Sequence, residues 1–118
     1  MASSKTLIKN GITDVVYRFV NDSATNQTFT IALATDIARA DQTIVGTPTV
    51  GISCLSFCTT AAIKITRNSN LQYYLVNTGE IQNAYATDNQ DNTSDIVIDI
   101  ASGTLEIRLL KGTQYQPI

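Results

Sequence analysis

The residues that could support covalent chemistry are few and lack their usual partners. The chain contains two cysteines, Cys54 and Cys58, and no histidine. A nucleophilic cysteine or serine commonly depends on a nearby base, and histidine is the commonest one. The neighbours of Cys54, which are Ser53 and Leu55, supply no cation that would activate its thiol. We therefore expect a protein that is not an enzyme.

The two cysteines also make a poor disulfide or metal pair. They are four residues apart in an extended-looking run, which separates their Cα atoms by roughly 13 Å. A disulfide requires less than about 7 Å. Two thiols without histidine or further cysteines are too few ligands for zinc. The sequence predicts two small buried side chains with free thiols.

Aspartates offer the other candidate chemistry. Asp95 and Asp99 would share one face of a strand, as paired carboxylates could for glycoside hydrolysis, but the chain has no tryptophan to line a sugar cleft. Asp88, Asp91 and Asp95, interleaved with asparagines, could supply oxygen ligands to Ca²⁺ without the spacing of an EF-hand. A solvated loop with Asx turns is the favoured interpretation. We expect no metal and no cofactor.

Composition and charge exclude two classes of partner. Apolar residues make up 43% of the chain and charged residues 15%, with a formal net charge of −2. Such a surface exerts no long-range attraction on a polyanion, so nucleic acid is not an expected partner. The chain has neither a run of about 18 apolar residues nor the apolar stretch of a secretion signal. We expect no membrane association and synthesis in the cytoplasm.

The elements that position these residues are short strands. Alternating apolar residues predict an antiparallel pair at 12–20 and 27–33, and asparagines at the turn predict a hairpin from 62–67 and 71–76. Between 34 and 49 the pattern weakens. There we expect a helical turn at 35–40 capped by Thr35, within a long connection for which a crossing between sheets is one possibility. The remaining predicted strands are 50–57, 80–84, 95–100 and 104–110.

The alternation also predicts which side chains face the core. On 50–57 it places Val50, Ile52 and Cys54 on one face and Leu55 and Phe57 on the other. The last two strands are expected to face each other across a turn at Gly103. The other inward residues are predicted to be Val15, Tyr17, Phe19, Phe29, Ile31, Leu33, Ile96, Ile98, Ile100, Leu105, Ile107 and Leu109.

These elements predict an all-β fold. We expect an antiparallel β-sandwich or jelly-roll-like domain of seven or eight strands with at most one short helical turn. At 118 residues the chain is long enough for one core, so residues 1–118 are interpreted as a single domain. Residues 1–11 and 111–118 fall outside the predicted strands and are interpreted as terminal arms.

Five short segments resemble one group of viral proteins, namely the small virion structural proteins of tailed phages that infect marine bacteria. The resemblance implies a β-sandwich decoration, or cement, protein that binds the outside of the assembled head shell and braces neighbouring capsomers. Its implied partner is the major capsid protein, its implied state a homo-oligomer, and its implied location the outer capsid surface of the virion. The segments are 7–10, 46–52, 63–70, 92–98 and 105–112.

The terminal arms are the expected docking contacts in such a protein. Leu7, Ile8, Tyr115 and Ile118 could add to the sheet edge of a neighbour or fill a groove on it. The alternative, given equal weight, is that the two ends are simply frayed.

Two other functions remain open. A glycan-binding surface module of the virion would use Tyr73 or Tyr74 together with the 88–95 loop. A small coat protein that forms the shell itself would have a suitable length and would be expected to assemble unaided.

Overall fold

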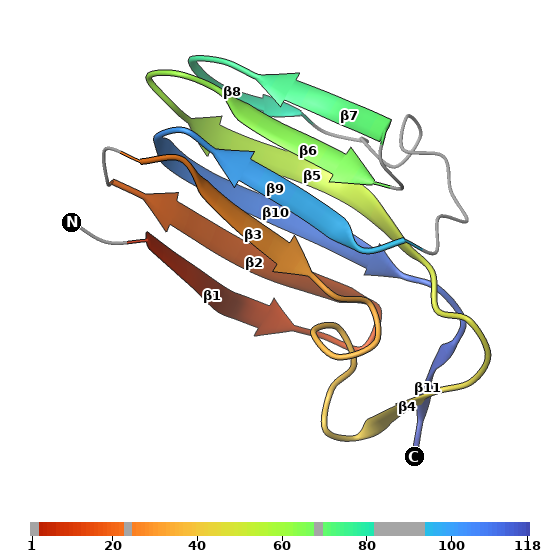
Figure 1. Cartoon of the computed structure of the whole chain (residues 1–118). Helices are drawn as coiled ribbons and strands as arrows, with labels where there is room; N and C mark the ends of the chain where they lie inside the picture. Colours follow the sequence, from red (N-terminus) through yellow and green to blue (C-terminus); the bar gives the residue numbers. More distant parts are fainter. Residues whose placement is uncertain (1–2, 23–24, 68–69, 82–93) are drawn as a thin grey trace.

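The fold consists of two packed antiparallel sheets and a small projecting ribbon (Figure 1). The computed structural model describes residues 3–22, 25–67, 70–81 and 94–118. Within these ranges the chain forms strands and turns but no helix, and so no helix that could span a membrane. The predicted all-β class is confirmed, and the two packed sheets are those of a β-sandwich.

The larger sheet has five antiparallel strands, with β1 and β8 at its edges. Its middle is formed by β10, which lies between β2 and β5 although the three are far apart in sequence. In spatial order the strands are β1 (Ser3–Asn10), β2 (Asp14–Asn21), β10 (Gly103–Lys111), β5 (Val50–Cys58) and β8 (Thr78–Ile81).

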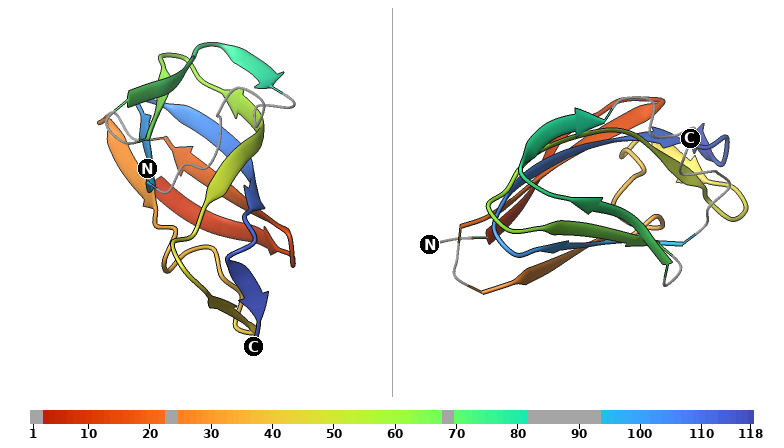
Figure 2. Two further views of the ribbon diagram at one scale, coloured as in Figure 1. Left: turned by 90° about the vertical axis from the view of Figure 1, so that its right-hand side faces the viewer. Right: turned by 90° about the horizontal axis from the view of Figure 1, so that it is seen from above.

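The smaller sheet has four strands, and a separate pair projects beyond it. In spatial order the four are β3 (Gln27–Ile31), β9 (Ile96–Ile100), β6 (Ile63–Arg67) and β7 (Asn70–Leu75). The pair consists of β4 (Gln42–Ile44) and β11 (Tyr115–Pro117), and we call it the terminal ribbon. Figure 2 shows the terminal ribbon extending from one end of the sandwich, with the C-terminus at its tip.

The core fills the space between the two sheets, and most of the predicted inward faces are confirmed. Side chains at every second position of β2, β9 and β10 are almost fully buried, as expected for strands with one face on a core. Phe29 is partly buried and packs against this cluster. Each large aliphatic side chain removed from water contributes about 1.5–3 kcal/mol to stability. The buried members predicted from sequence are Val15, Tyr17, Phe19, Ile31, Leu33, Ile96, Ile98, Ile100, Leu105, Ile107 and Leu109.

The predicted pairing of the first two strands is wrong. β2 and β3 lie in different sheets, so the loop after Asn21 crosses the sandwich instead of closing a hairpin. β9 and β10 are likewise in different sheets, and their apolar faces meet across the core as predicted. Alternation identifies a half-buried strand but does not reveal whether the next strand pairs with it or faces it.

The region after β3 also differs from expectation in one respect. No helical turn forms at Thr35. Instead the amide of Asp36 donates to the carbonyl of Ala32 at 2.8 Å, and the Asp36 carboxylate accepts from the amide of Ala32 at 2.9 Å. An aspartate that bonds back to the preceding backbone stabilises a turn in place of a helix. The long connection does cross between sheets, since β3 and β5 belong to different ones.

A β-bulge in β5 overturns the prediction of two opposite faces. Arg108 lies opposite Cys54, and the next residue of β10, Leu109, lies opposite Ile52, which leaves Ser53 as an extra residue. A bulge shifts the alternation by one position. Ile52 and Leu55 are therefore both buried in the same core, and Phe57 packs against it. Cys54 is only half-buried.

The hairpin predicted from residues 62–76 is confirmed as β6 and β7. Its turn at residues 68–69 lies outside the described residues. The weak strand expected at 80–84 is observed as β8, at Thr78–Ile81, and residues 82–84 also lie outside the described part.

A substitution at Gly103 tests whether β10 must begin with glycine. Its φ is +116°, and a Cβ there would lie 2.2 Å from the Cys58 carbonyl oxygen and 2.7 Å from the Thr59 Cα. We expect Gly103→Ala to lower the free energy of unfolding by about 3 kcal/mol, through backbone strain and overpacking together. Urea denaturation measures this quantity.

Gly46 provides the matched control for the same substitution. Its φ is +85°, but a Cβ there meets nothing within 4 Å. Gly46→Ala should lower the free energy of unfolding by only about 1 kcal/mol, from backbone strain alone. Equal losses in the two variants would contradict the steric argument at Gly103.

Candidate functional site

The side chains first considered for chemistry do not assemble into a catalytic or metal site in the described part of the chain. No group of three or more histidine, cysteine, aspartate or glutamate residues is placed there to hold a metal ion. Cys54 and Cys58 are both free thiols, as predicted, but their predicted burial is wrong, since Cys54 is only half-buried and Cys58 is exposed. The Cys58 sulfur accepts a hydrogen bond from Thr78 Oγ1 at 3.4 Å.

Asp99 in β9 and Asp95, the residue before β9, connect strands instead. Asp99 accepts a hydrogen bond from Thr28 Oγ1 at 2.5 Å, across the β3–β9 pair. Asp95 accepts from the backbone amide of Leu33 at 3.0 Å. Both carboxylates therefore help to hold β3 and the chain after it against β9. Asp88 and Asp91, the other two members of the possible calcium loop, lie outside the described residues.

An open hollow occupies the outer face of the five-stranded sheet, with a cavity volume of about 680 Å³. Strand register brings Arg18, Glu106, Ser56 and Glu80 into one row across it. The row contains charges of both signs on a solvent-facing sheet surface. Side chains on such a face are ordinarily solvated, and we assign this hollow no chemistry.

Three of the four predicted docking residues lie at the surface, and one does not. Leu7 is 47% exposed, Ile8 51% and Ile118 84%. Tyr115 is only 6% exposed, and its hydroxyl donates to the Leu33 carbonyl at 2.7 Å. Tyr115 is thus an internal anchor of the terminal ribbon and does not form a docking surface in this structure.

The N-terminal arm expected from sequence is mostly a strand. Residues 3–10 form β1, and all of them except Ile8 pair with β2. This strand is irregular at one point. The register shifts between Leu7 and Lys9, so Ile8 has no partner on β2. Because β1 is an edge strand, nearly all of its side chains are exposed and no inward apolar face marks it.

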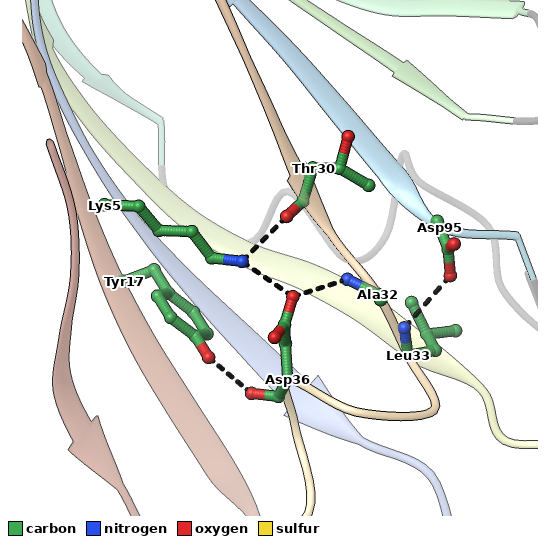
Figure 3. A network of polar contacts seen from close by, with 7 residues as sticks. All are labelled: Lys5, Tyr17, Thr30, Ala32, Leu33, Asp36 and Asp95. Atoms are coloured by element: carbon green, nitrogen blue, oxygen red, sulfur yellow. Dashed lines mark hydrogen bonds and ion pairs between the residues drawn. The ribbon is translucent and has the colours of Figure 1, made fainter. Parts of the chain in front are cut away.

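A polar network fastens β1 to the opposite sheet (Figure 3). The Lys5 ammonium donates to the Asp36 carboxylate at 2.7 Å and to the Thr30 carbonyl at 2.8 Å. The Tyr17 hydroxyl donates to the Asp36 carbonyl at 2.5 Å. Burial, and secondarily the charge of Asp36, raise the pKa of Tyr17, which keeps this hydroxyl a donor. These contacts therefore link β1 and β2 of the larger sheet to β3 of the smaller sheet and to the chain that follows β3.

The terminal ribbon is fastened by a second set of polar contacts. The Lys111 ammonium donates to Gln42 Oε1 at 2.6 Å and to Asn10 Oδ1 at 2.7 Å. The Gln42 amide in turn donates to the Ile12 carbonyl at 2.9 Å. Burial, with a contribution from the charge of Arg39, lowers the pKa of Lys111. The ribbon is therefore held at a defined position relative to β1 and its turn.

Sequence reasoning missed part of the exposed apolar surface. Ile12 lies in the turn after β1 and Val45 follows β4, and both side chains are largely exposed. Each adjoins a glycine, Gly11 or Gly46, and an apolar residue beside a turn glycine is the signal that could have identified them. A second exposed group, comprising Leu71, Tyr74 and Val76, lies along or just after β7.

Tyr115→Phe tests the anchoring role of Tyr115. Loss of the bond to Leu33 should lower the free energy of unfolding by about 1 kcal/mol at neutral pH. Burial, and to a smaller extent Asp95, raise the pKa of the Tyr115 phenol well above 10.0 in the folded protein. The unfolded state therefore loses this proton first, and the stability advantage of the wild type over the variant should shrink as pH rises above about 10.

Urea denaturation at several pH values measures both effects. Tyr74→Phe, which removes an exposed hydroxyl, is the matched control and should leave the neutral-pH stability unchanged. A wild-type advantage over Tyr115→Phe that stayed constant between pH 8 and 11 would contradict the anchoring role.

Comparison with known proteins assigns no function to this arrangement of residues. The chain matches no protein-family model, no curated protein and no solved structure.

Proposed function

We propose that this chain is a capsid decoration, or cement, protein of a tailed phage. It binds the outside of the assembled head shell, contacts the major capsid protein and stabilises the junctions between capsomers. It is made in the host cytoplasm and ends on the outer surface of the virion. The resemblance of its sequence segments to small virion proteins supports this proposal. The exposed apolar side chains of its sandwich fold support it as well.

The observation that carries the proposal is the placement of exposed apolar side chains. Leu7 and Ile8 lie on β1, Ile12 lies in the turn after it, and Val45 and Ile118 flank the terminal ribbon. Removing such surface from water against a partner is favourable by about 25 cal/mol per Å², before the cost of association is subtracted. The polar contacts of Lys5 and Lys111 hold the strand and the ribbon in place. Exposed apolar side chains on elements held in this way suit docking more than catalysis.

Repetition on a shell strengthens contacts that are individually weak. A decoration subunit meets the same shell site in many copies, and homo-oligomers engage several sites at once. Linked binding events of this kind gain avidity without new contacts. No deep pocket is needed for such a role.

The direct test uses virions of the phage whose genome encodes the chain. Mass spectrometry of purified particles should detect the protein, and particle images should place it outside the shell. Shells that lack it should bind the added protein and should disrupt at a higher temperature once it is bound. Absence from purified virions, or shells whose stability does not respond to it, would refute the proposal. Formation of empty particles by the chain expressed alone would favour a shell-forming coat protein.

A glycan-binding module of the virion is the second candidate function, and one observation favours it. Tyr74 is exposed on the smaller sheet, and the Lys64 ammonium lies 5.7 Å from its ring centroid. Tyr73, the other residue considered, packs against the core. An exposed aromatic face beside hydrogen-bond donors is a common platform for sugars.

A glycan array with and without Ca²⁺ tests this second candidate. Binding that is abolished by Tyr74→Ala and retained by Tyr74→Phe would support it, because phenylalanine preserves the ring face. An array that stays blank under both conditions would remove it.

A further inference from the structure

We infer that the free edge of β1 receives a strand from the shell protein, and that this added strand carries acidic side chains near Lys9. The inference rests on the proposed function and specifies how the docking would occur. The added strand would extend the five-stranded sheet across the boundary between two proteins. Main-chain hydrogen bonds would provide the contact, and side chains next to Lys9 would provide its selectivity.

The first support is the geometry of the edge. β1 pairs with β2 on one side only, and no other described strand lies on its second side. Along an antiparallel edge, every second residue directs its N–H and C=O groups away from the sheet. Pairing with β2 is regular from Ser3 to Leu7, a length of roughly 16 Å. This segment offers a straight template for an incoming strand.

The second support is that β1 is the longest edge strand of the two main sheets. At eight residues it is longer than the three other sheet edges, β8 with four residues, β3 with five and β7 with six. Proteins commonly limit unwanted pairing by shortening edge strands or by placing charges and bulges on them. On β1 the bulge is confined to the end near Ile8, and Lys5 is directed toward Asp36.

The third support is charge. The chain has a formal net charge of −2, whereas β1 contains two lysines and no acidic residue. Lys5 already pairs with Asp36 at 2.7 Å. The Lys9 side chain is 60% exposed and lies 3.4 Å from Asp14, whose carboxylate is closer to Arg108, at 3.0 Å. Lys9 thus shares the Asp14 carboxylate with Arg108, and its largely exposed ammonium is the charge on β1 that a partner can reach more easily.

The same charges disfavour a second copy of the chain as the occupant of this edge. Antiparallel pairing of β1 with itself, centred on residues 3–7, would place Lys5 opposite the Lys5 of the second copy and would offer Lys9 no acidic residue. Like charges across neighbouring strands are destabilising. An acidic strand from a different protein gains from Lys9, and its apolar side chains can cover Leu7 and Ile8.

The experiment measures binding of the full chain to purified shells that lack it. Lys9→Glu and Ile8→Asp should each weaken binding by about tenfold, which corresponds to 1.4 kcal/mol. The matched controls are Lys64→Glu and Leu71→Asp, the same changes at exposed positions of the smaller sheet, and both should bind as the wild type does. Added salt should weaken wild-type binding more than that of Lys9→Glu, because salt screens the lysine.

Hydrogen exchange distinguishes the addition of a shell-protein strand to β1 from contacts made by side chains alone. Alternate backbone amides between Ser3 and Leu7 should exchange fast in the free protein and slowly on the shell. If the wild type fails to bind shells, the proposed function itself is wrong. If it binds while both variants bind equally well and β1 exchange is unchanged, only the β1 inference is overturned. Slowed exchange in concentrated protein without shells would overturn it in favour of self-pairing.

Discussion

The guanidinium of Arg67 joins the two sheets from inside the sandwich. This side chain is fully buried, and it donates to the Val50 carbonyl at 2.6 Å and to the Ser94 carbonyl at 3.0 Å. Removing a cation from water costs several kcal/mol, so the surrounding acceptors must be well placed to offset that cost. Arg67 ends β6, Val50 begins β5, and Ser94 leads into β9. This side chain thus ties the end of β6 in the smaller sheet to the start of β5 in the larger one.

Much of the architecture can be predicted from local pattern, and the errors have physical causes. The inward faces of β2, β9 and β10 follow from alternation, because each of these strands has one buried side. Strand pairing does not follow from alternation, because a strand that faces β2 across the core alternates in the same way as a strand that lies beside β2. Alternation does not place the bulge at Ser53 either, although Gly51, two residues earlier, is the kind of residue that often marks one.

The candidate docking surface was only partly predictable for a related reason. Exposed apolar side chains such as Leu7 and Ile118 can be suspected from sequence, but burial of Tyr115 depends on the position of Leu33, which is distant in the chain. Strand β1 escapes pattern reasoning because an edge strand without an apolar inner face resembles a loop. The polar contacts that position it, such as Lys5 with Asp36, join residues that only the folded topology brings together.

The insertion of β10 between β2 and β5 has a consequence for how the chain folds. Both neighbours of β10 lie far before it in sequence, so the middle of the larger sheet cannot close until a distant segment arrives. Folds dominated by such non-local pairings reach the native state slowly, on timescales of about milliseconds to seconds. During that interval β2 and β5 present open edges to other chains. Productive folding therefore depends on β10 reaching this gap before a strand of another molecule does.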